Sequence, residues 1–201
     1  MFEVTQIIQS PIGLLLLAII LYAEVGLFLG FFLPGDTLLI AAGIYAHQGN
    51  LSLAAIILVA SAAAIAGDST GYFIGRKLGR KVFRKDDGII FRKDHIDKAE
   101  AFYEKYGAKT LLVAHYIPVI RTFTPLLAGV AKMNYRKFLL FDVIGDITWA
   151  VSVTLVGYYV GSRIPGIDKY ILLIIGSVVL VSLVPTLYHL IRAHLKKRAS
   201  N

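Results

Sequence analysis

An arginine stands between two prolines in a stretch that is otherwise apolar enough to enter a membrane. Arg121 follows Pro118 and precedes Pro125 within the segment 110–136. A proline inside a helix removes a backbone donor and clashes with the carbonyl four residues earlier, which costs about 3 kcal/mol. Hydrocarbon tolerates a broken helix only where it is buried in protein or lines a polar cavity. The pattern therefore predicts a binding element at membrane depth, and the alternative is a kinked span whose arginine reaches the headgroups.

The chemistry that Arg121 suits best is recognition of a phosphate group. A guanidinium binds phosphate oxygens through two parallel hydrogen bonds. Thr122 and Thr124 add hydroxyl groups beside it. Helix N-termini expected at Thr37 and after Pro125 would add unpaired N–H groups and the positive ends of helix dipoles. We expect these groups to bind a substrate phosphate.

A histidine lies on the other side of the first proline. His115 and Arg121 are six residues apart and flank Pro118, so a broken backbone could direct both side chains to one phosphate. Histidine changes charge near neutral pH, and it would be cationic mainly under mildly acidic conditions. The alternative is a histidine whose ring is satisfied by neighbouring carbonyls.

Two carboxylates, Glu24 and Asp36, flank an earlier turn that contains Pro34 and Gly35. Ionised carboxylates are unsuited to direct contact with phosphate. Burial favours their neutral form and a nearby arginine favours their charged form, so alternating exposure could load and release a proton. We expect Glu24 and Asp36 to exchange protons. A structural ion pair with Arg121 is the alternative.

Further polar residues recur at a spacing of four, which places them on one face of a helix. Asp142 and Asp146 form one such pair, but no histidine accompanies them at ligand spacing, so no metal site is expected. Asp146 is instead expected to support packing or proton conduction. Asp68, Tyr72 and Arg76 form a second row with a supporting role.

The elements that must position these residues belong to one membrane domain, residues 1–201. The chain is 57% hydrophobic, its mean hydropathy is +0.69, and it has no cysteine. Apolar runs of over 20 residues can cross a hydrocarbon core of about 30 Å. The expected segments are a first broken hairpin (12–50), a transmembrane helix (51–79), a basic cytoplasmic loop with an amphipathic helix (80–109), a second re-entrant hairpin (110–131), two further transmembrane helices (138–161 and 170–191) and a basic cytoplasmic tail (192–201).

The formal net charge of +8 is concentrated in two places. No lysine or arginine precedes Arg76, whereas residues 76–109 hold eleven of the 21 and residues 192–198 hold four. Short basic loops stay cytoplasmic, and their charge favours contact with anionic headgroups rather than nucleic acid in so apolar a chain. Three crossings between these basic regions would leave the tail outside. If residues 110–131 enter and leave on one side, both regions are cytoplasmic.

A weak internal repeat supports the same topology. Each half of the chain has a proline-broken hairpin, an Ala-Gly pair and a long helix that carries a Gly-Asp pair. The two hairpins would return to opposite sides, so the halves would be inverted, which is typical of transporters with a central site. The paired positions are Ala42-Gly43 and Gly67-Asp68 in the first half, and Ala128-Gly129 and Gly145-Asp146 in the second.

Nearly the whole chain resembles the DedA family of membrane proteins, also described by its VTT or SNARE-associated domain. The resemblance implies an all-α polytopic protein with two facing re-entrant hairpins. It also implies return of undecaprenyl phosphate across the bacterial plasma membrane or movement of phospholipids, with dependence on the proton gradient. The residues that carry it are Glu24, the motif FFLPGD ending at Asp36, GDSTGYFIGRKLG from Gly67, FYEKYGAK running into HYIPVIRTFTPLLAG, and GDITWA from Gly145.

The functional residues of that family fall on particular positions of this chain. Its acidic pair matches Glu24 and Asp36. The second arginine of its arginine–aromatic–x–proline–x–x–arginine pattern matches Arg121, whereas the first falls on His115. The chain departs from the family pattern at His115, and this departure bears on both substrate and coupling.

These observations predict a lipid flippase in the plasma membrane that carries undecaprenyl phosphate, with an anionic lipid and the bilayer as partners and no cofactor. The alternatives are a flippase or scramblase for phospholipids such as phosphatidylethanolamine, an ion-coupled antiporter of a small cation, and a non-transporting assembly factor. Enzyme activity is not expected, because the sequence has no nucleophile elbow, HExxH motif or P-loop. A homo-oligomer is compatible with the sequence.

Overall fold

The computed structural model describes residues 11–26, 35–49, 51–78, 107–164 and 170. The described residues form helices and contain no strand, which confirms the all-α class. The helices are α2 (Pro11–Gly26), α3 (Gly35–His47), α4 (Leu53–Leu78), α6 (Thr110–Ala114), α7 (Pro118–Val130) and α8 (Tyr135–Arg163). Several predicted features lie outside the described residues: Pro34 and its turn, nearly all of the basic loop 80–109 with its amphipathic helix, the helix 170–191 beyond its first residue, and the tail 192–201.

Two helices are long and apolar enough to cross a membrane. Leu53–Lys77 has 25 residues and Tyr135–Arg163 has 29. At about 1.5 Å per residue, both exceed a hydrocarbon core of about 30 Å. They agree with the predicted helices 51–79 and 138–161. The second begins earlier than predicted because Asn134 caps it, accepting hydrogen bonds from the backbone of Arg136 at 3.0 Å and Lys137 at 3.3 Å.

The remaining helices are too short to cross alone. α2 has 16 residues, α3 and α7 have 13 each, and α6 has five. A break separates α6 from α7 directly before Pro118, as predicted. Proline fits there because the first residues of a helix have no acceptor for their N–H groups.

The expected helix N-terminus after Pro125 is wrong, because α7 continues through this proline. A proline inside a membrane helix is tolerated where neighbouring helices satisfy the freed backbone groups. α3 likewise begins at Gly35 and not at Thr37, so Asp36 lies inside its first turn and does not cap it.

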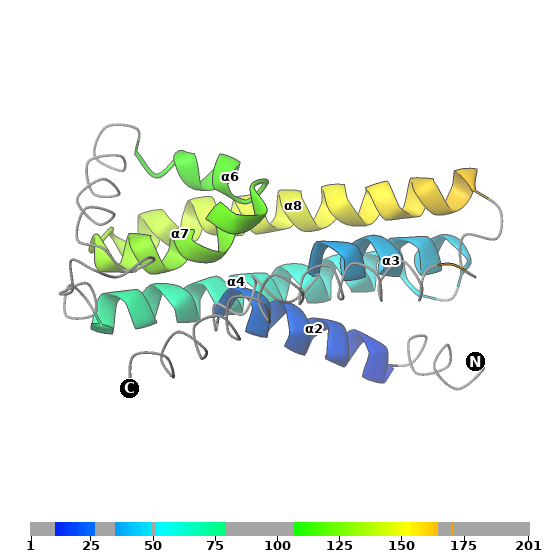
Figure 1. Cartoon of the computed structure of the whole chain (residues 1–201), viewed down its shortest axis with the longest axis horizontal. Helices are drawn as coiled ribbons and strands as arrows, with labels where there is room; N and C mark the ends of the chain where they lie inside the picture. Colours follow the sequence, from blue (N-terminus) through cyan, green and yellow to red (C-terminus); the bar gives the residue numbers. More distant parts are fainter. Residues whose placement is uncertain (1–10, 27–34, 50, 79–106, 165–169, 171–201) are drawn as a thin grey trace, which may run out of the picture.

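Figure 1 shows α4 and α8 running the length of the molecule, with α3 and α7 beside them at opposite ends. α3 packs mainly against α8, and α7 packs mainly against α4. The other two short helices reverse this pattern, because α2 packs on α4 and α6 packs on α8. Each long helix is therefore covered by one short helix from the first half of the chain and one from the second.

Glycines on the long helices let the short helices approach backbone to backbone. A Cβ added at Gly157 of α8 would overlap the carbonyl of Ile40 in α3. A Cβ added at Gly75 of α4 would overlap the carbonyl of Leu126 in α7. Small residues at helix interfaces permit this close packing in membranes. In each contact, a glycine of a long helix from one half of the chain meets a short helix: α8 meets α3 from the other half, and α4 meets α7 from the other half.

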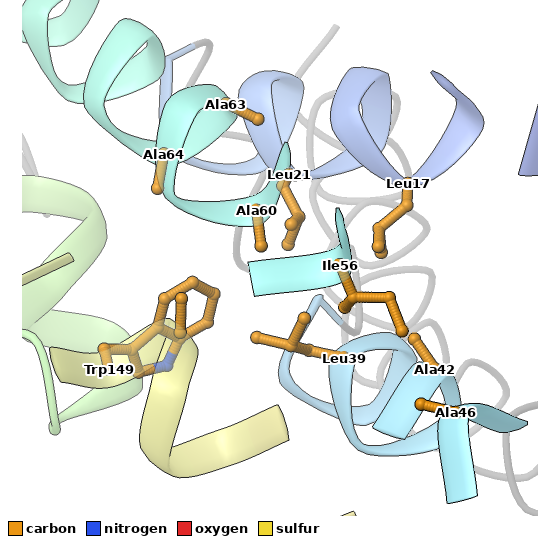
Figure 2. Close-up of a cluster of buried hydrophobic side chains, with 11 residues drawn as sticks. Leu17, Leu21, Leu39, Ala42, Ala46, Ile56, Ala60, Ala63, Ala64 and Trp149 are labelled. Atoms are coloured by element: carbon orange, nitrogen blue, oxygen red, sulfur yellow. The ribbon is translucent and has the colours of Figure 1, made fainter. Parts of the chain in front are cut away.

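The main apolar core lies where α2, α3, α4 and α8 meet. Figure 2 shows Leu39 of α3 among side chains of the other helices, with Trp149 of α8 at one side of the cluster. Many of the α4 contacts are alanines, which keeps the helices close. Around this core, large apolar side chains remain exposed, including Leu15 (59%), Leu58 (70%) and Tyr159 (62%). A soluble monomer rarely exposes such extensive apolar surface.

Candidate functional site

Charged residues occupy the interior of this apolar bundle. Each of them is at most 4% exposed, and they come from α2, α4, α7, α8 and the break before α7. A buried ionisable residue inside a membrane protein marks a functional site unless it is paired for structure alone. These residues are Glu24, Asp68, His115, Arg121, Asp142 and Asp146.

Arg121 is held between a carboxylate and an aromatic face. Its Nη1 donates to Oδ1 of Asp36 at 3.0 Å. Trp149 Nε1 donates to the same oxygen at 2.9 Å, and the Arg121 Cζ lies 3.8 Å from the centroid of the Trp149 ring. The ring face attracts the guanidinium electrostatically. Asp36 remains 37% exposed at its side chain, so the pair has one partner open to its surroundings.

The ion pair joins the N-terminal turns of two short helices. Asp36 lies in the first turn of α3, and Arg121 is three residues after Pro118, with which α7 begins. In Figure 1 both helices start near the middle of the molecule and run toward opposite ends. Helix N-termini carry partial positive charge and unpaired N–H groups. Two such ends therefore converge on Arg121.

Glu24 lies beside this pair. It is 4% exposed, and its Oε2 has no hydrogen-bond partner among the described residues. Its carboxyl accepts a backbone hydrogen bond from Gly35, and a Cβ on that residue would overlap the carboxyl. Glycine at position 35 therefore allows α2 to bring a carboxylate against the first turn of α3.

His115 faces three carboxylates. Its Nε2 lies 3.2 Å from Asp146 Oδ1, 3.5 Å from Asp68 Oδ2 and 3.7 Å from Asp142 Oδ1. Its other ring nitrogen, Nδ1, lies 2.6 Å from the carbonyl oxygen of Leu111. None of the Nε2 contacts has hydrogen-bond geometry. We call Asp68, His115, Asp142 and Asp146 the His115 cluster.

The structure joins some of the predicted site residues and separates others. Arg121 meets Asp36, which agrees with the alternative of an ion pair. Asp68 and Asp146 meet His115. His115 and Arg121 do not share partners, because each faces different carboxylates. Three carboxylates would repel a phosphate near His115, so the expected phosphate contact by this histidine has no support in the geometry.

The predicted threonines are buried or half-buried. Thr124 Oγ1 donates to the carbonyl of Ile120 at 2.7 Å. Thr122 is 4% exposed, and Thr37 is half-buried in α3. The hydroxyl oxygen of Thr124 keeps its capacity to accept a hydrogen bond.

Tyr72 and Arg76 support a helix junction and not the charged centre. Arg76 Nη1 donates to the Tyr72 hydroxyl at 2.7 Å, and that hydroxyl donates to the carbonyl of Met133. The Tyr72 ring stacks on Phe138 with centroids 4.8 Å apart. The network ties α4 to the segment between α7 and α8.

Two site residues were not assigned from the sequence. Asp142 shares a helix face with Asp146, and this spacing was the available signal. Trp149 follows Asp146 by three residues on the same face, but this spacing did not assign it a role in the site. The sequence could not show that His115, which lies in the break between α6 and α7, packs against α8. A Cβ at Gly145 would lie 2.6 Å from His115 Nδ1, so this glycine makes room for the ring.

The described residues form only helices, with an apolar outer surface around a buried charged centre, and these features indicate a helical membrane protein. The VTT domain matches residues 33–159 of this chain. The chain is 39% identical over 179 residues to Protein DedA of Escherichia coli (strain K12), covering 88% of this chain and 81% of the relative. It is 39% identical over 182 residues to the uncharacterized membrane protein Rv0364 of Mycobacterium tuberculosis (strain H37Rv), covering 90% and 79%.

A more distant relative is the inner membrane protein YqjA of Escherichia coli (strain K12). It is 31% identical over 163 residues, covering 80% of this chain and 74% of the relative. No solved structure matches the chain. The chain belongs to the DedA family of membrane proteins, which is defined by the VTT domain.

Proposed function

We propose that this protein is a flippase for an anionic lipid, most specifically undecaprenyl phosphate, in the bacterial plasma membrane. The observation that carries the proposal is Arg121, buried at the meeting point of two helix N-termini. Guanidinium and helix N-termini both favour phosphate. A lipid phosphate is the anion that could reach such a site from within a bilayer.

Asp36 would act as the competitor of the phosphate for Arg121. While Asp36 is ionised it pairs with Arg121 Nη1 at 3.0 Å. Protonation of Asp36 would weaken this pair and free the guanidinium for substrate. Glu24 would relay the proton, and the contact of its carboxyl with the first turn of α3 supports this role. Proton loading and lipid binding would then be coupled at one ion pair.

A groove beside the site offers room for part of the lipid tail. It has a volume of about 190 Å³ and lies between α2 and α3. Its lining is almost entirely apolar and includes Leu17, Leu38 and Tyr45. Leu38 and Asp36 are two residues apart on α3 and point to different faces of the helix, so the tail of a lipid bound at Arg121 would pass around the start of α3 to reach this groove.

Alternating access would follow from an inverted repeat with two re-entrant hairpins. The reciprocal packing of α3 on α8 and α7 on α4 supports this topology. So do the matching backbone contacts at Gly157 and Gly75. In this topology the protein is multi-pass, and the loop 76–109 and the C-terminus are cytoplasmic. We infer transport and not catalysis as its role.

Lipid bound to the gently purified protein tests the substrate class. Native mass spectrometry of the wild type should show a bound polyprenyl phosphate or phospholipid, and its mass identifies which. Arg121→Gln should lose this lipid. Ser61→Ala should keep it, because it removes a buried hydroxyl of α4 that has no hydrogen-bond partner among the residues that the structure describes. Retention of the same lipid by Arg121→Gln would overturn the phosphate site.

A second candidate is an ion-coupled antiporter of a small cation. The His115 cluster favours it, because three buried carboxylates attract cations more than anions. Sealed proteoliposomes with a pH-sensitive dye distinguish the two candidates. Proton movement driven by Na⁺ or K⁺ without lipid substrate would support the antiporter and contradict the flippase.

A further inference from the structure

We propose that the His115 cluster binds a divalent first-row transition-metal ion, with Asp68, His115, Asp142 and Asp146 as its ligands. No metal was expected from the sequence, because no histidine accompanies the two α8 aspartates at ligand spacing. The fold supplies that histidine from the break before α7 and adds an aspartate from α4. One ligand atom from each residue lies within 4.8 Å of all the others.

The hydrogen bond at the other side of the histidine ring sets its chemistry. A carbonyl oxygen only accepts hydrogen bonds, so Nδ1 must donate to Leu111, 2.6 Å away. In the neutral ring, Nε2 then carries a lone pair directed among carboxylate oxygens, which are also acceptors. Either a proton or a metal cation must therefore lie between them. Metal-binding histidines commonly donate their second nitrogen to a carbonyl in this way.

The distances around Nε2 fit a small metal ion. Zinc bonds of about 2.0–2.1 Å in a tetrahedron place neighbouring ligand atoms about 3.3–3.4 Å apart. The three distances from Nε2 to carboxylate oxygens are 3.2, 3.5 and 3.7 Å. The distances from Nε2 are therefore close to those of a four-coordinate site, whereas the ligand atoms as a group lie within 4.8 Å of one another and would draw closer around an ion.

Burial and unpaired atoms supply an independent reason. All four residues are at most 4% exposed. Within the described part of the chain, both carboxylate oxygens of Asp142 lack a hydrogen-bond partner, as do Asp68 Oδ1, Asp146 Oδ2 and His115 Nε2. With three ionised carboxylates, even a cationic imidazole leaves two negative charges uncompensated. A divalent ion bound by the neutral ring leaves one negative charge and gives the unpaired atoms a partner.

The donor set selects the kind of metal. Calcium and magnesium prefer oxygen ligands alone, whereas one imidazole nitrogen with carboxylates suits zinc, manganese or iron. Zinc binds such sites more tightly than manganese. Its ligands come from α4, the α6–α7 break and α8, so bound zinc would cross-link elements from both halves of the chain.

Zinc binding by the full chain in detergent tests the site. Chelator-treated wild type, reloaded with zinc chloride and desalted, should retain about one zinc ion per chain. His115→Gln and Asp142→Asn should weaken zinc binding by more than the roughly 10–100-fold typical of losing a residue that only supports a ligand. Glu24→Gln changes a buried carboxylate outside the cluster in the same way, and it should keep the ion. Excess magnesium should not displace the zinc.

His115→Arg keeps the test decisive if other variants fold poorly. A guanidinium supplies the missing positive charge to the three carboxylates, so this variant should fold while losing zinc. Cobalt offers a second readout, because its visible absorption spectrum reports a tetrahedral site in the wild type and should be lost in His115→Arg. Absence of retained zinc in the wild type, or equal retention in His115→Arg, would overturn the proposal in favour of an imidazolium paired with carboxylates.

Discussion

Replacing Arg121 with lysine keeps a positive charge at the proposed phosphate site and removes the planar guanidinium. Arginine Nη1 donates to Asp36 Oδ1 at 3.0 Å, and its Cζ lies 3.8 Å from the Trp149 ring centroid. A lysine ammonium can still pair with Asp36. It cannot offer two parallel donors to a phosphate. We therefore expect the variant to fold and to bind lipid phosphate poorly.

The expected loss of lipid affinity in Arg121→Lys is larger than the expected loss of folding stability. A lost hydrogen bond between charged groups costs about 1.5–3 kcal/mol, which corresponds to about 10- to 150-fold weaker lipid binding. The ion pair with Asp36 persists, and the Asp36 side chain is 37% exposed, so solvent screens it. Pairs that reach solvent typically contribute about 1 kcal/mol or less. Lipid affinity should therefore fall much further than the free energy of unfolding.

The site contains its own fluorescent probe. Trp149 is the only tryptophan of the chain, and its ring lies against Arg121. Phosphate binding that draws the guanidinium away from the ring should change the fluorescence emission of Trp149. Titration with a short-chain polyprenyl phosphate therefore reports lipid affinity directly. Ser61→Ala is the control and should bind as the wild type does. Equal affinity in Arg121→Lys, or a loss of affinity no larger than the loss of stability, would refute the bidentate role.

Three further outcomes are expected. Gly75→Ala should destabilise the protein by about 1–3 kcal/mol, because its Cβ would overlap the Leu126 carbonyl; an unchanged melting temperature would contradict the close helix contact. Asn134→Ala should cost about 1 kcal/mol by removing the cap of α8, whereas Asn134→Asp should be nearly neutral in thermal unfolding. In this cysteine-free chain, cysteines at Gly88 and Lys197 should be labelled from the cytoplasm, and labelling from opposite sides would exclude a re-entrant hairpin at residues 110–131.

The lengths of apolar runs and the positions of prolines predicted much of the fold. The long helices α4 and α8 follow from uninterrupted apolar sequence, and the break before Pro118 follows from its missing donor. The effect of Pro125 was overestimated, because packing on α4 keeps α7 helical through it. Single-residue rules cannot include such tertiary support.

The charged centre was only partly predictable. Glu24, Asp36 and Arg121 stand out because each is an isolated charge in apolar sequence. The His115 cluster does not, because its residues come from three separate segments, with Asp68 and Asp142 on opposite sides of His115 in the chain. Only the packing of the α6–α7 break against α8 brings them together. The same packing separates His115 from the phosphate role that its spacing to Arg121 suggested.

The central claim is that the protein moves an anionic lipid across a membrane with Arg121 as its headgroup ligand. The most direct test follows fluorescent undecaprenyl phosphate in sealed proteoliposomes, with a membrane-impermeant quencher that reports the lipid of the outer leaflet. Wild type should let the quencher reach most of the label over time, faster with an imposed proton gradient, while Arg121→Gln and empty liposomes should leave the inner-leaflet fraction protected. Equal protection in wild-type and empty liposomes, or full translocation by Arg121→Gln, would contradict the claim.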